Sequence, residues 1–219
     1  MRIPPRTASH VVLLLAAAAA PSAAAVLDVP VTPLVIRIYD APAIASGHSL
    51  PALKEAHDIL AAAGFAAEWV GCAMPRTSDG RCGVPLGGAE LAVRVVVAPR
   101  PAQETRNVAM GYSLVDPGTR GGALATVYLD RVTQFADTAR SSTAALLGRA
   151  IAHEIGHLLL GTTEHGRAGV MRAFWSHDVV RRSRPHEWRF TPLEARRMRD
   201  AVTRRETRGS LAAHVVRGD

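Results

Sequence analysis

The stretch "STAALLGRAIAHEIGHLLLGTTEHGRAGVM", residues 142–171, determines how the rest of the chain is interpreted. Its first part carries apolar residues at the spacing of a buried helix face, and a residue that can cap a helix stands before them. We expect Ser142 or Thr143 to cap this helix and Gly161 to end it. The apolar positions are Leu146, Leu147, Ala150, Ile151, Ile155 and Leu158.

Two histidines four residues apart lie near the end of this helix. His153 and His157 project from the same helix face, so both imidazoles can bind one metal ion. Glu154 lies one step around the helix, where its carboxylate can act on a water molecule held by that ion. A catalytic zinc site takes three protein ligands and leaves the fourth position for water. We therefore predict one catalytic Zn²⁺, with His153 and His157 as ligands and Glu154 as the catalytic base.

The third ligand is expected from the segment that follows Gly161. His165 comes eight residues after His157, and a chain leaving a helix at a glycine can fold back over that distance. We take His165 as the third ligand. The alternatives are side chains further along or beside it, and Glu194 among them has the simpler task of capping a later helix. These alternatives are Glu164, His177, Glu187 and Glu194.

The motif "HEIGHLLLG", followed by His165 and by Met171 in "GVMR", resembles the zinc metallopeptidases of the zincin group, and within them the metzincins. Their pattern is HExxHxxGxxH with a methionine-bearing turn beneath the metal. This chain has one extra residue before the glycine and one more before the third histidine. It is similar to small, exported bacterial predicted metalloproteases.

This resemblance implies zinc-dependent hydrolysis of peptide bonds in a peptide or protein substrate. It implies a zincin-like α+β fold, in which a small mixed twisted sheet packs on the active-site helix and a helix lies at the C-terminus. Met171 is then the floor of the metal site. Residues 123–130 correspond to the edge strand along which an extended peptide lies, although an ordinary paired strand is the alternative for this segment.

The remaining elements follow from local patterns. We expect strands at residues 34–40, 65–70 and 91–98, and a helix at 49–64 that Ser49 caps. The turn signal "DPGTRGG" between residues 110–115 and 123–130 predicts a hairpin. Thr191, Pro192 and Glu194 form a capping box that starts a helix over residues 192 to about 206. Beyond Arg208 the sequence carries no packing signal.

The first 25 residues have the pattern of a signal peptide, with an arginine-bearing start, an apolar run and small residues for cleavage near Ala25. Residues 26–208 then form one domain, and 209–219 a frayed tail. An uncleaved anchor is the alternative, but the run is short for a bilayer span. In an exported protein, Cys72 and Cys82, the only cysteines of the chain, are expected to form a disulfide.

The charge distribution bears on a second hypothesis. Residues 167–219 hold 13 arginines against 6 acidic residues, whereas residues 26–166 are close to neutral. The sequence has no nucleic-acid-binding motif and few aromatic residues for stacking, which excludes a nucleic-acid partner. A secreted, non-catalytic metal-binding or polyanion-binding protein is therefore the alternative to a peptidase. The sequence indicates neither the cleavage specificity nor the oligomeric state.

Overall fold

The computed structural model describes residues 31–39, 47–72, 80–99, 109–116 and 118–217, with the backbone alone over 209–217. The predicted signal peptide and its cleavage position near Ala25 lie outside the described residues.

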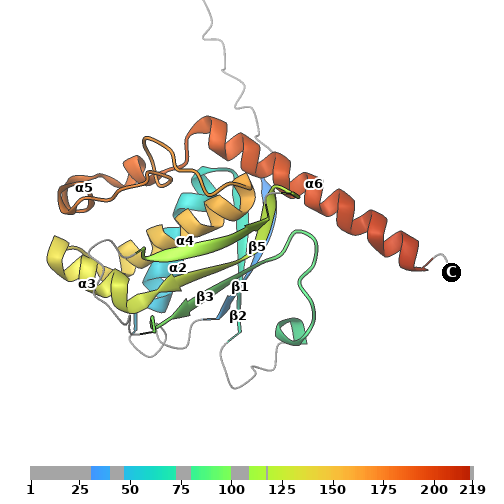
Figure 1. Cartoon of the computed structure of the whole chain (residues 1–219), viewed down its shortest axis with the longest axis horizontal. Helices are drawn as coiled ribbons and strands as arrows, with labels where there is room; N and C mark the ends of the chain where they lie inside the picture. The colour runs from blue at the N-terminus through green and yellow to red at the C-terminus, as the bar shows by residue number, and fades with distance from the viewer. Residues whose placement is uncertain (1–30, 40–46, 73–79, 100–108, 117, 218–219) are drawn as a thin grey trace, which may run out of the picture.

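A five-stranded mixed sheet with the order β2-β1-β3-β5-β4 forms one layer of the fold (Figure 1). Strands β1, β2, β3 and β5 pair in parallel, and β4 pairs antiparallel with β5. The central strands contribute buried aliphatic side chains to the core, among them Ile36 of β1, Val93 of β3 and Val127 of β5. The strands span Thr32–Tyr39 (β1), Phe65–Gly71 (β2), Leu91–Val96 (β3), Gly111–Asp116 (β4) and Gly121–Tyr128 (β5).

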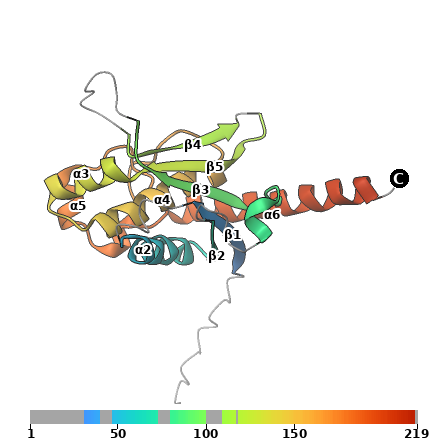
Figure 2. The same cartoon turned by 90° about the horizontal axis from the view of Figure 1, so that it is seen from below.

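Helices α2 and α4 pack against each other and cover one face of this sheet (Figure 2). The core lies between them and the sheet, and α6 packs on α4. The predicted α+β class, with a small mixed sheet on the helix of the histidine motif and a C-terminal helix, is confirmed. The helices span Ser49–Ala62 (α2), Leu129–Ala139 (α3), Thr143–Leu160 (α4), His177–Arg182 (α5) and Pro192–Arg217 (α6), with short 3₁₀ turns at Gly80–Gly83 (η1) and Pro185–Trp188 (η2).

The predicted hairpin is present as β4 and β5, but its place in the sheet differs from the expectation. Strand β5 pairs with β3 on one side and β4 on the other, so residues 123–130 do not form the edge. The edge strand is β4, and the role assigned to residues 123–130 was wrong. The paired alternative holds, because β5 has a hydrogen-bonded neighbour on each side. Asp130 already belongs to α3, a separate helix that the sequence analysis did not predict.

Four local predictions about helix ends can be compared with the structure. Ser142 caps α4 as expected, whereas α2 begins at Ser49 itself, after His48, without a side-chain cap. Thr191 and Glu194 form the predicted capping box, in which each side chain accepts a hydrogen bond from the other residue's backbone N–H. Helix α6 does not end near residue 206 but continues to Arg217, through part of the segment expected to be frayed.

The disulfide between Cys72 and Cys82 is present and joins the end of β2 to η1. Arg37 of β1 lies under the segment that follows η1. It is 2% exposed, forms an ion pair with Glu90 and donates to the backbone oxygens of Val84 and Pro85. The two terminal guanidinium nitrogens of Arg37 are thus compensated by that segment, which allows a charged residue to be buried in the strand.

Among the described residues, no helix has the length and apolar character that crossing a membrane requires.

Candidate metal centre

Helix α4 carries the histidine motif through the centre of the molecule, and its end is set by Gly161. This residue has a φ of 66° in the left-handed region, as glycine at the end of a helix commonly has. A Cβ atom there would collide with the backbone carbonyl of Arg120 in the β4–β5 turn. Gly161 therefore both ends the helix and allows the hairpin to pack against it.

Three histidines come together where the end of α4 meets the segment that follows it. One ring nitrogen from each of His153, His157 and His165 lies within 4.8 Å of the others. The Nε2 atoms of His153 and His157 are 3.0 Å apart. His157 is buried and His165 is exposed, so one side of the group is open to solvent. The structure thus brings His165 to the helical pair.

Backbone carbonyls of the segment after α4 fix the two helical rings. The Nδ1 atom of His153 lies 2.8 Å from the Val170 oxygen, and the Nδ1 atom of His157 lies 2.8 Å from the Thr162 oxygen. A carbonyl can only accept, so both Nδ1 atoms carry the proton and donate. A hydrogen bond of this kind on the far nitrogen is the usual support of a metal-ligating histidine.

The protonation of these rings tests whether a metal fits. Burial lowers the pKa of His153 to about 4 and also lowers the pKa of His157, so both rings are neutral near pH 7. With Nδ1 protonated in each, both Nε2 atoms present lone pairs and have no proton to share across 3.0 Å. Two facing acceptors repel unless a cation lies between them. The donor set, three imidazole nitrogens with solvent on one side, fits a zinc ion with an open position.

Glu154 is buried beside this group, under the edge strand. It is 5% exposed, and burial raises the pKa of its carboxyl to about 7. A Cβ atom on Gly111 of β4 would lie 2.8 Å from Oε1 of Glu154, so only a glycine allows β4 to pass this close. The Ser113 hydroxyl lies 2.7 Å from Oε2 of Glu154 and 2.7 Å from its backbone oxygen.

Ser113 and Gly111 are site residues that the sequence reading missed. They belong to β4, and their approach to Glu154 spans about forty positions of sequence. A serine and a glycine in a strand carry no local signal of such a contact. These two residues could have been predicted only from the strand order, in which β4 rather than β5 is the edge strand above α4.

Met171 packs on α4 at Gly156, between the two helical histidines, and its role as the floor of the site stays a prediction. It is 1% exposed, and its backbone oxygen accepts from Gly166, the residue after His165. Its side chain lies directly against Gly156 of α4, where an added Cβ atom would collide with the methionine sulfur. Trp175 packs edge-on against the His153 ring at 5.6 Å. The segment from Thr162 to Trp175 therefore surrounds the base of the histidine group.

The other candidates for third ligand are engaged or placed elsewhere. His177 lies 3.2 Å from the Thr138 hydroxyl and packs on Phe135. Glu194 is the capping-box partner of α6. Neither of these, nor Glu164 or Glu187, joins a metal-binding group in the described part of the chain.

The fold was compared with solved structures. The solved structure of a zinc-dependent peptidase from Methanocorpusculum labreanum is similar to this chain at 16% sequence identity and a TM-score of 0.46, covering 75% of this chain and 99% of that one. No protein-family model matches the sequence, and no curated protein matches it either.

Proposed function

We propose that this protein is a zinc-dependent peptidase of the zincin type. His153, His157 and His165 bind one Zn²⁺, and Glu154 acts as the general base. The observation that carries the proposal is the pair of neutral rings whose Nε2 atoms face each other at 3.0 Å, next to a buried carboxylate. A pair of core histidines without a metal would share a proton or turn away from each other.

The chemistry follows from the groups at the site. When bound, zinc lowers the pKa of a water molecule and polarises the carbonyl of the bond to be cleaved. Glu154 takes the proton from the attacking water and returns it to the leaving amine. Burial raises the pKa of this carboxyl to about 7 in the zinc-free protein, and an adjacent cation would favour the ionised form, which is the form that accepts a proton. Ser113 holds the carboxylate in position through Oε2.

The edge strand supports a peptide substrate rather than a small molecule. Strand β4 pairs only with β5 among the described residues, and it passes directly over Glu154. An extended peptide can add to such an edge through main-chain hydrogen bonds. This places its backbone across the histidine group, where a peptide bond can meet the attacking water.

Metal analysis combined with four single variants tests the proposal. We expect purified wild type to bind one zinc per chain and to cleave peptides until a strong chelator is added. Glu154→Gln should retain zinc and lose hydrolysis by at least about a thousandfold, since it removes the general base. His153→Ala and His165→Ala should lose both zinc and activity, because each removes a ligand.

His177→Ala is the matched control, since it removes a histidine outside the group and should keep both properties. Hydrolysis that a chelator leaves unchanged would refute the enzyme assignment. Zinc binding without cleavage of any peptide in a diverse library would instead favour the non-catalytic, metal-binding alternative. If His165→Ala kept full zinc affinity, the third ligand would have to come from elsewhere.

We also propose that the protein is exported and carries out this activity outside the cytoplasm. The disulfide between Cys72 and Cys82 supports this, because such bonds persist in oxidising compartments. N-terminal sequencing of the protein from the cell exterior or periplasm tests it, and a mature chain that begins near Val26 is expected.

A further inference from the structure

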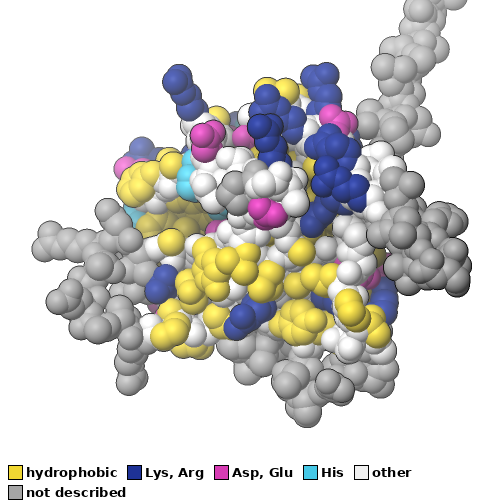
Figure 3. Space-filling view, turned by 45° about the vertical axis from the view of Figure 1, so that its right-hand side comes forward, with side chains coloured by type: hydrophobic (Ala, Val, Ile, Leu, Met, Phe, Trp, Pro, Cys, Tyr) yellow, Lys and Arg dark blue, Asp and Glu magenta, His cyan; other side chains and the backbone are white. Residues whose placement is uncertain are grey.

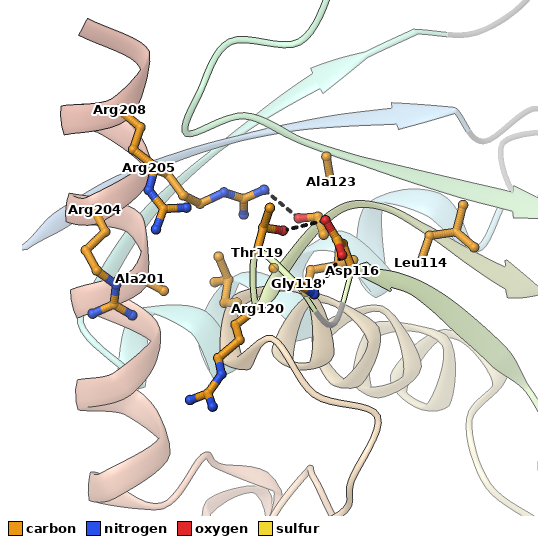
Figure 4. Close-up of a pocket in the computed structure, with 14 residues that line it drawn as sticks. Leu114, Asp116, Gly118, Thr119, Arg120, Ala123, Ala201, Arg204, Arg205 and Arg208 are labelled. Atoms are coloured by element: carbon orange, nitrogen blue, oxygen red, sulfur yellow. Dashed lines mark hydrogen bonds between the residues drawn. The ribbon is translucent and has the colours of Figure 1, made fainter. Parts of the chain in front are cut away.

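A second concave site lies beside the edge strand, outside the histidine group. It is a cavity of about 670 Å³ between the β4–β5 hairpin, the end of α4 and the exposed side of α6. Figure 4 shows the hairpin on one side of this cavity and the α6 arginines on the other. We call it the arginine pocket. Its lining includes Leu114, Leu158, Arg120, Arg204, Arg205 and Arg208.

The charge of the arginine pocket is strongly positive. Arg204, Arg205 and Arg208 come from one stretch of α6, and Arg120 comes from the hairpin turn. The ion pairs of the described chain involve none of these four. One acidic residue, Asp116, lines the pocket, and its two oxygens accept from the Gly118 N–H and the Thr119 hydroxyl. The guanidinium groups therefore have no anionic partner of their own there.

Arg205 is the most informative of the four. One terminal nitrogen, Nη2, donates to the backbone oxygen of Gly122, which fixes the side chain against the hairpin. The other, Nη1, is buried and has no hydrogen-bond partner among the described residues. Leaving a buried charged donor unpaired is costly. Because Nη1 has almost no exposed surface, an acceptor from a ligand reaches it only when the Arg205 guanidinium turns toward the pocket.

The pocket is continuous with the path proposed for the substrate. Ser113 contacts Glu154, and the pocket begins at the next residue of β4, Leu114. A bulge interrupts the β4–β5 ladder between Leu114 and Val115, which changes the direction of the edge at this point. From Ser113 to Asp116 the strand rises about 10 Å, or about three residues of an extended peptide.

We propose that the arginine pocket binds a carboxylate side chain of the substrate, an aspartate or glutamate two to three residues from the cleaved bond. This inference rests on the proposed peptidase function for its position relative to the cleaved bond. The exposed Arg120, Arg204 and Arg208 hold the carboxylate, together with Arg205 once its guanidinium turns toward the pocket. The exposed side chain of Leu114 contacts the methylene groups of the acidic side chain. The pocket thus makes the enzyme selective for acidic peptides.

A polyanion is the competing occupant, because arginines gather on this side of the molecule (Figure 3). A linear polyanion contacts exposed cations along a surface and needs no cavity. Here, however, the arginines surround a cavity rather than a flat surface, and its lining includes the exposed Leu114 and the half-buried Ala123. A single carboxylate on a short apolar stem fits this arrangement better than a chain of charges.

The test measures binding, so that it does not depend on turnover. The full chain with Glu154→Gln, loaded with zinc, is titrated into fluorescein-labelled ten-residue peptides of alanine and serine. Each peptide carries one glutamate at a different position, and a partner peptide carries glutamine there. We expect one glutamate position to bind at least about tenfold more tightly than its glutamine partner, since a charged hydrogen-bonded pair replaces a neutral one.

Variants in the same background assign the effect to the pocket. Arg205→Gln should reduce the preference for glutamate to within about twofold. Arg196→Gln, which removes an exposed arginine from the same helix outside the pocket, should leave it unchanged. Because Arg205 also contacts the hairpin, its variant could unfold. The double variant Arg204→Gln/Arg208→Gln removes two exposed cations only and should lower the preference at least threefold, with an unchanged melting temperature.

Several outcomes overturn the proposal. Equal binding of every glutamate and glutamine pair does so, and so does a preference that survives both pocket variants. Tight, salt-sensitive binding of a sulfated polysaccharide with no glutamate preference shows a polyanion surface instead. If wild type cleaves no peptide but the glutamate preference depends on Arg205, the pocket stands and the peptidase assignment fails. If wild type cleaves peptides without any acidic preference, the peptidase assignment stands and the pocket proposal fails.

Discussion

Replacing Gly156 by alanine tests whether Met171 is the floor that supports the metal site. Gly156 lies between the two helical histidines, and an added Cβ atom would lie 2.7 Å from Cε1 of Phe190 and would collide with the Met171 sulfur. Overpacking of this kind costs about 1–3 kcal/mol. Alanine regains about 1 kcal/mol through its better helix propensity. We therefore expect a net loss of about 0–2 kcal/mol in the free energy of unfolding.

The double variant separates this clash from other effects. Met171→Ala alone removes a fully buried side chain and should cost about 2–5 kcal/mol. In Gly156→Ala/Met171→Ala the new methyl group occupies space that the methionine has left, so the two losses should not add. The double variant should be at least about 1 kcal/mol more stable than additivity predicts.

Urea denaturation of the zinc-free proteins measures the coupling, and a competing chelator measures the zinc affinity of each. Gly156→Ala should also weaken zinc binding, since a shift of α4 against Met171 displaces the rings on either side of position 156. Losses that add within about 0.5 kcal/mol would show that the two residues are not in contact. Weakened stability with unchanged zinc affinity would show that Met171 supports the core but not the site.

In the zinc-free protein, burial lowers the pKa of His153 from 6.5 to about 4 and raises that of Glu154 from 4.5 to about 7. Between pH 4.5 and 6.5 the unfolded chain holds an extra proton at His153 and the native chain holds one at Glu154, so these contributions cancel. The variant Glu154→Gln lacks the glutamate contribution and keeps that of His153. As the pH increases from 4.5 to 6.5, the free energy of unfolding of this variant should therefore rise by about 1.4 kcal/mol per pH unit relative to that of wild type. Urea denaturation of both proteins across this pH range measures the difference. If the stability of the variant and that of wild type change with pH in the same way, the prediction is wrong. Ser113→Ala should lower kcat about tenfold with zinc content unchanged, because one hydrogen bond positions the base; kcat equal to wild type contradicts this. Cys72→Ser should lower the free energy of unfolding by about 2–4 kcal/mol, because it frees the loop that the disulfide closes. The loss should appear as a lower urea midpoint, equal to the midpoint of wild type whose disulfide has been reduced.

Features that depend on neighbouring residues could be predicted from the sequence. Helix α4 begins after Ser142 and ends at Gly161 as expected, because capping and left-handed backbone are properties of a few adjacent residues. The positions of His153 and His157 on one face follow from helical geometry alone. The capping box of α6 is local in the same sense, as is the pairing of two cysteines across a short loop.

Features that depend on which segments meet required the tertiary structure. The sequence predicted the hairpin but assigned the edge to β5, because nothing in either strand records which neighbours it has in the sheet. The same limit hid Ser113, which contacts Glu154 only because β4 lies over α4. It also hid the burial of Arg37, whose charge is compensated by Glu90 from a distant segment.

The choice of His165 over its rivals shows how the two kinds of information combine. Chain length allowed His165, His177 and Glu194 alike, so the sequence could rank them only by residue type and spacing. In the folded chain the 162–172 segment holds both helical rings through its carbonyl oxygens and brings His165 to them. The sequence by itself therefore determined the helical half of the histidine group. The third nitrogen, the edge strand over the base and the arginine pocket were decided by the packing of segments far apart in the chain.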